Sequence, residues 1–222
     1  MKKIVLLLGL VAFTTVVFAQ TSEPTGRTQN EAIKTLFGRK DKIVNGWFIG
    51  PSTTYTKFGK RDIWMCGITL GWVIDHNFTI GLTGNAFSNK NGLFYDHVTD
   101  TTGAYLEGGY GGLLLEYTLF PHSVIHVTFP LIIGGGSASY IAENKSFKKD
   151  GDGKHNWDHK TLDSDEYLVI EPGVKAEINL CKFLRFDAGI TYRYVGDLRL
   201  LNTSNDMMNN FSVTAGFKIG KF

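Results

Sequence analysis

The stretch that decides the fold lies late in the chain and reads LRFDAGITYR over residues 184–193. Its even positions are apolar or aromatic, whereas its odd positions hold arginine, aspartate, glycine and threonine. Alternation of this kind indicates a β-strand with one apolar and one polar face. The stretch also exceeds the ~5–6 residues of a usual soluble strand and matches the ~9–11 residues with which a tilted strand crosses a bilayer.

Similar segments recur along the chain from residue 43 onward. Eight are expected as strands: about 45–58, 62–74, 78–88, 104–120, 124–141, 166–179, 183–197 and 209–221. The apolar residues fall on even positions in the second, third, sixth and seventh segments and on odd positions in the fourth, fifth and eighth, while the first is ambiguous. A soluble sandwich or lipocalin-type barrel turns such a face inward, and a membrane barrel turns it toward lipid. The alternation alone therefore leaves both open.

The connections between the segments favour the membrane barrel. Three of them, at about 75–77, 121–123 and 180–182, are short, whereas those at about 89–103, 142–165 and 198–208 are long. Short turns at one end and long loops at the other are typical of membrane barrels, whose short turns face the periplasm. With Trp, Tyr and Phe near the segment ends, this asymmetry predicts an all-β, transmembrane, antiparallel up-and-down barrel of eight strands.

The N-terminus carries the pattern of an export signal. Lys2 and Lys3 precede an apolar run over 4–18, and Ala19 ends a matching cleavage site. The run is shorter than the roughly 20 residues that a spanning helix needs, which argues against a membrane anchor. We therefore expect a signal peptide over 1–19, a polar periplasmic lead-in segment over 20–42 and an outer-membrane barrel over 43–222.

These features resemble the small eight-stranded outer-membrane barrels of Gram-negative bacteria, of the OmpA and OmpX type. The blocks YLEGGYGGL over 105–113 and LIIGGG over 131–136 further resemble a subfamily of such barrels with no assigned activity. The chain ends in Phe222, and outer-membrane proteins usually end in phenylalanine for recognition by the outer-membrane assembly machinery. The hydrophobic residues Phe217 and Ile219, however, occupy odd positions, whereas Phe222 occupies an even one. The resemblance implies a protein of the cell outer membrane, in contact with its lipid, and specifies no activity.

The polar face of the strands carries four acidic and four basic residues. They are Glu116, Glu171, Glu177, Asp187, Lys175, Arg185, Arg193 and Lys218. An unpaired buried charge costs several kcal/mol, so charges that face a narrow lumen are expected to pair. Because an eight-stranded barrel is just wide enough to be filled by side chains, we expect a lumen plugged by this charge network. Glu107 breaks the pattern, and either a bulge at 108–109 or a position above the lipid would explain it.

The charges also predict how the sixth and seventh segments pair. The expected pairs are Glu177 with Arg185 and Lys175 with Asp187. A turn over 180–182 gives this register, in which the numbers of opposed residues sum to 362. A sum of 364 would oppose Glu177 with Asp187, and like charges directly opposite are destabilising. The alternative is that the charges bridge to other strands, Glu116 and Lys218 included.

Two other groups of residues have the chemistry of a site. His126 on the polar face lies near Ser123, but no Ser/His/Glu spacing places a triad, so a hydrogen-bonded interior histidine is expected. The loop over 148–159 has Asp-x-Asp-Gly and two histidines four residues apart, ligand types that suit Ca²⁺ or Zn²⁺. Thr161 occupies the place of the glutamate that completes a calcium loop, so a solvated loop is expected. We assign no catalytic residue, metal or cofactor.

Composition excludes further classes. A formal charge of +2 without a Lys/Arg cluster argues against nucleic acid as a partner. Two cysteines are too few for a disulfide scaffold, and Cys66, expected to face lipid, and Cys181, in a short turn, are not expected to pair.

Three functions from different classes remain open. The first is a monomeric, non-enzymatic barrel with a structural or surface-interaction role through its extracellular loops. The second is a narrow channel for small solutes, and the third is an outer-membrane enzyme that modifies lipid. The eight strands and the balanced charges of the lumen favour the first.

Overall fold

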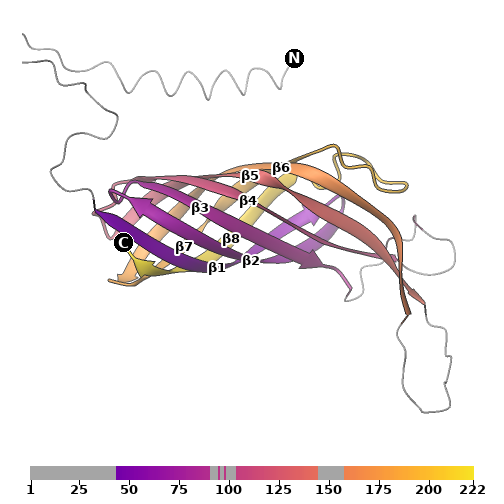
Figure 1. Cartoon of the computed structure of the whole chain (residues 1–222), viewed down its shortest axis with the longest axis horizontal. Helices are drawn as coiled ribbons and strands as arrows, with labels where there is room; N and C mark the ends of the chain where they lie inside the picture. The colour runs from indigo at the N-terminus through magenta and orange to yellow at the C-terminus, as the bar shows by residue number, and fades with distance from the viewer. Residues whose placement is uncertain (1–43, 91–94, 96–97, 99–103, 145–157) are drawn as a thin grey trace, which may run out of the picture. The chain divides into compact units, whose positions relative to one another are not determined.

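The computed structural model describes residues 44–90, 95, 98, 104–144 and 158–222. They form a closed barrel of eight antiparallel strands in chain order, in which β8 pairs with β1 (Figure 1). The strands are β1 (Asn45–Phe58), β2 (Arg61–Ile74), β3 (Phe78–Ser88), β4 (Ala104–Leu119), β5 (Ile125–Asn144), β6 (Asp158–Cys181), β7 (Leu184–Gly196) and β8 (Asn210–Lys221). The predicted fold class is confirmed. Within these residues no helix has the length and apolar character needed to cross a membrane.

Two strands are longer than the sequence predicted. β5 continues to Asn144 and β6 begins at Asp158, so much of the expected loop over 142–165 is a ribbon of two paired strands. The pairing shifts by one residue next to Tyr140, where β6 has a bulge. The prediction was wrong here because the bulge interrupts the alternation and because residues 163–166 are polar on both faces.

The inward and outward faces follow the predicted parity in seven strands. In β7, for example, Ile190 is exposed on the outside, whereas Arg185 and Asp187 are buried inside. β1, which the sequence left ambiguous, turns its even residues inward, and Phe48 and Phe58 are both buried. Its orientation was hidden because bulky apolar residues occupy both of its faces.

The two ends of the barrel differ in their connections. At the short-turn end, where the C-terminus also lies, residues 75–77, 120–124 and 182–183 join the strands (Figure 1). The turn predicted over 180–182 is therefore displaced to 182–183. The opposite end, the long-loop end, carries the long connections after β3, β5 and β7 and one tight turn at Gly59, whose φ of 59° suits glycine.

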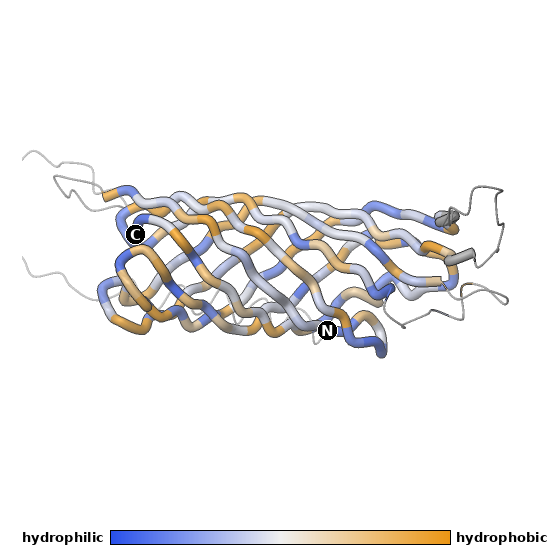
Figure 2. Tube along the Cα trace, turned by 90° about the horizontal axis from the view of Figure 1, so that it is seen from below, coloured by the Kyte–Doolittle hydropathy of each residue, from blue (hydrophilic) through white to orange (hydrophobic). Residues whose placement is uncertain are grey.

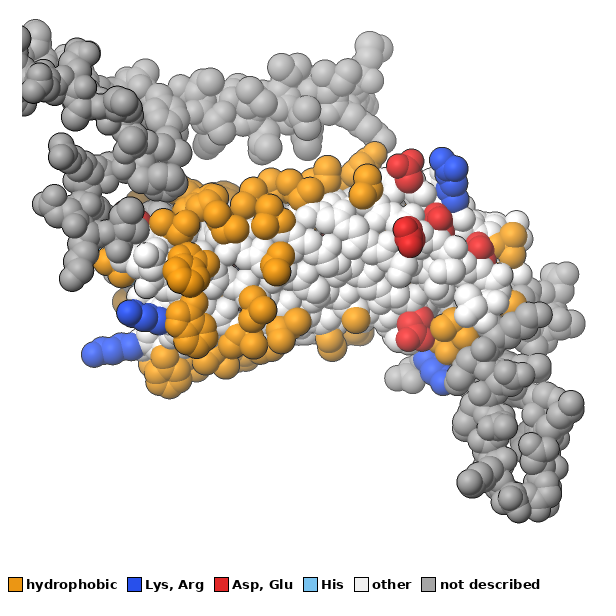
Figure 3. Space-filling model, in the orientation of Figure 1, with side chains coloured by type: hydrophobic (Ala, Val, Ile, Leu, Met, Phe, Trp, Pro, Cys, Tyr) orange, Lys and Arg blue, Asp and Glu red, His pale blue; other side chains and the backbone are white. Residues whose placement is uncertain are grey.

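The outside of the barrel divides into an apolar belt and a polar rim. On the face drawn in Figure 3, hydrophobic side chains extend from the short-turn end past the middle of the barrel, and acidic side chains gather toward the long-loop end. Figure 2 shows hydrophobic residues recurring along the strands of the belt. Trp64 is 65% exposed, Leu82 64% and Trp72 55%. Side chains of this kind face water only rarely in such numbers, so the belt is a lipid-contacting surface.

Glu107 lies on the polar rim. It is exposed, and it pairs in register with Ser88 of β3 and Ser139 of β5. The pairing of β4 continues through 108–109 without a shift, so the bulge considered for this residue is absent. Its outward position is explained by its place beyond the aliphatic part of the belt.

Candidate functional site: the closed lumen

In the half of the barrel next to the short turns, the lumen is filled by charges around Glu177. We call this the Glu177 cluster: Glu116, His126, Glu177, Arg185 and Lys218. Glu177 Oε1 accepts a hydrogen bond from Arg185 Nη1 at 2.9 Å and lies 2.8 Å from His126 Nε2. Glu177 Oε2 lies 2.6 Å from Lys218 Nζ, which also donates to Glu116 Oε1 at 2.6 Å. The cluster thus cross-links five strands, and the Glu177 side chain is only 1% exposed.

Two aromatic rings cover this cluster on the side of the short turns. The guanidinium carbon of Arg185 lies 3.7 Å from the ring centroid of Phe222, and Lys218 Nζ lies 4.9 Å from that of Phe48. The two rings stack with their centroids 6.1 Å apart. Cation–π contacts of this kind stabilise charges that have lost their water.

The pairing of β6 with β7 differs from the predicted register. Opposed residues sum to 364, so Glu177 lies opposite Asp187, because the turn is at 182–183 and β6 has an irregularity near Cys181. The predicted ion pairs form all the same: Arg185 with Glu177 and Lys175 with Asp187, both at 2.9 Å. They join diagonal neighbours, which long side chains can reach. The register was predicted wrongly because the prediction placed the oppositely charged residues directly opposite each other and allowed for no bulge near the turn.

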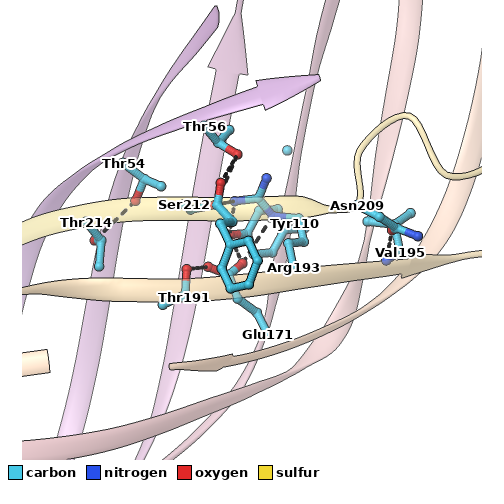
Figure 4. Close-up of polar contacts among 12 residues, drawn as sticks. Thr54, Thr56, Tyr110, Glu171, Thr191, Arg193, Val195, Asn209, Ser212 and Thr214 are labelled. Atoms are coloured by element: carbon cyan, nitrogen blue, oxygen red, sulfur yellow. Dashed lines mark hydrogen bonds and ion pairs between the residues drawn. The ribbon is translucent and has the colours of Figure 1, made fainter. Parts of the chain in front are cut away.

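A second cluster surrounds Arg193, nearer the long-loop end. The side chain of Arg193 is completely buried, and its Nε donates to Glu171 Oε2 at 3.1 Å. Arg193 Nη2 donates to the hydroxyls of Tyr110 and Ser212, both at 3.3 Å. Glu171 also accepts hydrogen bonds from Tyr110 at 2.5 Å and from Thr191 at 2.6 Å. Figure 4 shows these side chains converging from β4, β6, β7 and β8.

Between the two clusters the lumen retains a cavity of about 50 Å³. Its lining includes the hydroxyl-bearing residues Ser52, Thr54, Thr69, Thr83 and Thr214. A water molecule needs roughly 10–15 Å³ of such space and two or more polar partners. The cavity is therefore a chamber for a few waters with charged clusters on either side.

Beyond Arg193 the interior becomes an apolar core. Its buried members are Phe58, Ile63, Met65, Phe87, Tyr95, Val98, Ala104, Leu106, Tyr110, Ala138, Tyr140, Tyr167, Val169, Val195, Leu198, Leu200 and Met208. Tyr95 and Val98 come from the connection after β3, so part of a predicted loop turns inward. Burial raises the pKa of Tyr95 to about 12. This core closes the lumen at the long-loop end.

The connection over 197–209 forms a cap on this core. Leu198, Leu200 and Met208 are 0–5% exposed. Two carboxylates of β6 hold the cap in place: Asp165 accepts the backbone N–H of Arg199 at 2.5 Å and Asp163 that of Leu201 at 2.6 Å. The sequence predicted this segment as an extracellular loop and missed that part of it packs into the barrel.

The eight charged residues named from the sequence all lie inside the barrel, and each takes part in an ion pair. His126 lies inside as well, against Glu177, whereas Ser123 is in a turn, where its carbonyl accepts from Asn179 Nδ2 at 3.0 Å. The sequence missed the hydroxyl partners Tyr110, Thr191 and Ser212. Their inward parity was the available signal, but an inward tyrosine or threonine is equally compatible with plain packing.

Other residues singled out from the sequence lie elsewhere. Most of the loop over 148–159 is outside the described residues. In the part of the chain that the structure describes, no group of three or more His, Cys, Asp or Glu side chains is placed to hold a metal ion. Cys66 and Cys181 are free thiols on the outside.

A hollow of about 1130 Å³ interrupts the outer surface across β2 to β6. Two rows of small residues cross its floor: Gly84, Gly111 and Gly135 in one, Ala86, Gly109 and Ser137 in the other. A Cβ added at Gly84 would meet no atom within 4 Å. Packing of the barrel therefore does not require this glycine.

These features define a class of protein. A closed barrel of eight strands with an apolar outside and a charged lumen is a small outer-membrane barrel. Among solved structures, the chain is similar to a major outer membrane protein from Thermus thermophilus, with 9% identity, a TM-score of 0.52 and coverage of 80% of this chain and 99% of that one. That match shows the fold.

Two further structures match with lower TM-scores. They are Neisserial surface protein A (14% identity, TM-score 0.48, 81% of this chain and 97% of that one) and Ail, the attachment invasion locus protein of Yersinia pestis (10%, 0.45, 79% and 97%). No family model matches the chain, and a search of curated proteins gives no match.

Proposed function

We propose that the chain is a monomeric, non-enzymatic outer-membrane barrel with a structural or surface-interaction role, whose lumen is closed and whose long loops face the outside of the cell. The observation that carries this proposal is the filling of the lumen. The Glu177 cluster, the Arg193 cluster and the apolar core follow one another along its length. A solute crossing the barrel would have to displace all three.

The orientation follows from the two ends. In bacterial outer-membrane barrels the short turns face the periplasm and the longer loops face outward. On that basis the cap over 197–209 and the ribbon of β5 and β6 lie on the cell surface. The ribbon extends beyond the other strands (Figure 1), and it is the part of the surface that a partner would reach first.

The two alternatives have less support. A channel needs a continuous path, whereas the described lumen retains a cavity of only about 50 Å³ between two charged clusters. A lipid-modifying enzyme needs a nucleophile or base that meets lipid, whereas His126 is 1% exposed inside the barrel. These observations support the surface-interaction role.

Orientation and closure are both testable. A protease site inserted within 145–157 should be cut on intact cells, and cleavage only after the outer membrane is opened would contradict the proposal. Purified monomer in planar bilayers should give no stable conductance steps of porin size. Such steps would favour the channel, and a changed lipid A mass profile on expression would favour the enzyme.

A further inference from the structure

The hollow in the outer surface is a trough with one aliphatic wall. On its side toward the short turns, a row of large residues crosses β2 to β6 in register, and each is 42–64% exposed: Leu70, Leu82, Leu113, Ile133 and Ile170. The two rows beyond this wall hold only glycine, alanine or serine on β3, β4 and β5. The trough is therefore a gap in the lipid-contacting belt, where three neighbouring strands lack large side chains.

The two ends of the trough differ in polarity. At the β2 end its lining includes Cys66 and Ile68, and Trp64, two residues further along the strand, is 65% exposed. At the β6 end its lining includes Glu166 and Asp197, both exposed. Strands are spaced by about 4.8 Å, so the trough is about 19 Å long from β2 to β6. It thus leads from a polar end on the rim to an apolar end within the belt.

The polar end carries negative charge that the protein does not compensate. Glu166 lies opposite Ser137 of β5, and Asp197 directly follows β7 with a left-handed φ of 63°. In the described part of the chain, neither carboxylate forms an ion pair, and no Lys or Arg lines the hollow. Charge complementarity therefore favours an occupant with a cationic group at this end.

The remaining features of the trough favour a lipid as that occupant. The trough continues the surface that contacts lipid, and its aliphatic wall suits an acyl chain. Its volume of about 1130 Å³ is near the upper end of the usual range for ligand pockets. A second copy of the chain fits less well, because a two-fold dimer brings the same patch together from both subunits and would set one hollow against the other.

We infer that the trough binds one lipid molecule whose headgroup carries a protonated primary amine. The ammonium, which has three N–H donors, lies at Glu166 and Asp197. The acyl chain runs from there toward β2, over the floor that Gly84 and its neighbours leave open and along the aliphatic wall. The inference requires only the membrane barrel and is independent of the proposed function.

The test is native mass spectrometry of the chain purified in a mild detergent with EDTA, which removes divalent cations. Phosphatidylethanolamine, phosphatidylcholine and phosphatidylglycerol with identical acyl chains are added in equal amounts. Phosphatidylcholine has no N–H donor, and phosphatidylglycerol has no cation. Folding of every variant is checked by heat-modifiable gel mobility.

Two kinds of variant probe the two parts of the site. Gly84→Leu fills the floor, where an added Cβ meets no atom within 4 Å, and Ala176→Leu adds similar bulk on the exposed outside of β6 as its control. Glu166→Gln and Asp197→Asn remove the charges, and asparagine tolerates the left-handed backbone at position 197. Glu107→Gln, an exposed rim carboxylate outside the lining, is the matched control.

The unaltered chain and both controls should retain one phosphatidylethanolamine per chain in preference to the other two lipids. Gly84→Leu should lose this bound lipid. Each carboxylate variant should lower the preference over phosphatidylcholine by roughly 1.5–5-fold, the range expected for one exposed ion pair. Equal retention of the three lipids by the unaltered chain, undiminished retention by folded Gly84→Leu, or a lipid-free dimer would overturn the inference.

Discussion

The two halves of the barrel have opposite kinds of interior, one charged and one apolar, although the same strands form both. Next to the short turns, where lipid surrounds the barrel, the inward residues of β6 include the charged Glu171, Lys175 and Glu177. Toward the long-loop end, the inward positions of the same strand are Tyr167 and Val169. There the inside is an apolar core of the kind that soluble proteins have, and the outside changes from apolar at Leu168 and Ile170 to polar at Ser164 and Glu166.

The comparison teaches that the parity of a strand fixes which residues point inward but not whether they are polar. The two faces of a strand must differ in polarity for the pairing register of that strand to be specified. Where lipid surrounds the barrel, charged side chains make the inward face differ from the outward one, and these charges must then be paired within the lumen. In water the difference comes from apolar side chains, which need no partners.

The largest expected effect is in the charged half. Glu177→Ala leaves Arg185 and Lys218 with one carboxylate fewer and removes the hydrogen bond of His126. Breaking a buried pair in this way should lower the free energy of unfolding by about 3–5 kcal/mol. Urea titration followed by heat-modifiable gel mobility measures it.

Glu107→Ala on the polar rim is the control for this variant. The residue is exposed, so the change should stay within about 0.5 kcal/mol. Similar losses for both variants would mean that the lumen charges are not coupled as described.

The apolar half should respond to a loss of packing. Leu198→Ala removes a side chain with 0% exposure from the cap, at an expected cost of about 2–3 kcal/mol, in the lower part of the range for such changes because a connection can relax. Leu201→Ala, in the same connection but 48% exposed, should cost less than about 0.5 kcal/mol. Equal effects in the same urea assay would argue that the cap does not pack into the barrel.

The diagonal pairing of β6 and β7 can be tested by charge reversal. Lys175→Glu places a third acidic side chain beside Asp187 and Glu177 and should cost about 1–3 kcal/mol. Adding Asp187→Lys should restore at least half of the loss, because the two groups are in contact at 2.9 Å. A double variant no more stable than the single one would show that these side chains do not interact.

The smallest effect is expected at the outer hollow. Gly84→Ala should leave stability unchanged or raise it by up to about 1 kcal/mol, because the added Cβ meets no atom and glycine is unfavourable within a strand. Gly134→Ala, which faces inward, is the contrasting variant: its Cβ would lie 2.0 Å from the carbonyl oxygen of Gly111. If the two variants have the same stability, the assignment of Gly84 to the outer face of β3 and of Gly134 to the inner face of β5 is wrong.

Much of this comparison could be read from the sequence, and its failures have physical causes. The alternation in β7 predicted its faces, and the need to pair buried charges placed Arg185 and Asp187 in the lumen. The extension of β6 was not predicted because the extra residue of its bulge shifts the alternation of inward and outward positions by one. The cap escaped it because Leu198 and Leu200 sit in a connection without periodicity, where only tertiary packing decides which side chains are buried.

The central claim is that the surroundings of the barrel change along each strand, and β6 allows the most direct measurement. Spin labels placed one at a time at the outward positions 164, 166, 168, 170, 174 and 176, in a background with both cysteines replaced, report contact with oxygen in lipid or with a polar nickel reagent in water. We predict nickel access at 164 and 166 and oxygen access from 168 to 176. The same reagent preference at all six positions would contradict the account.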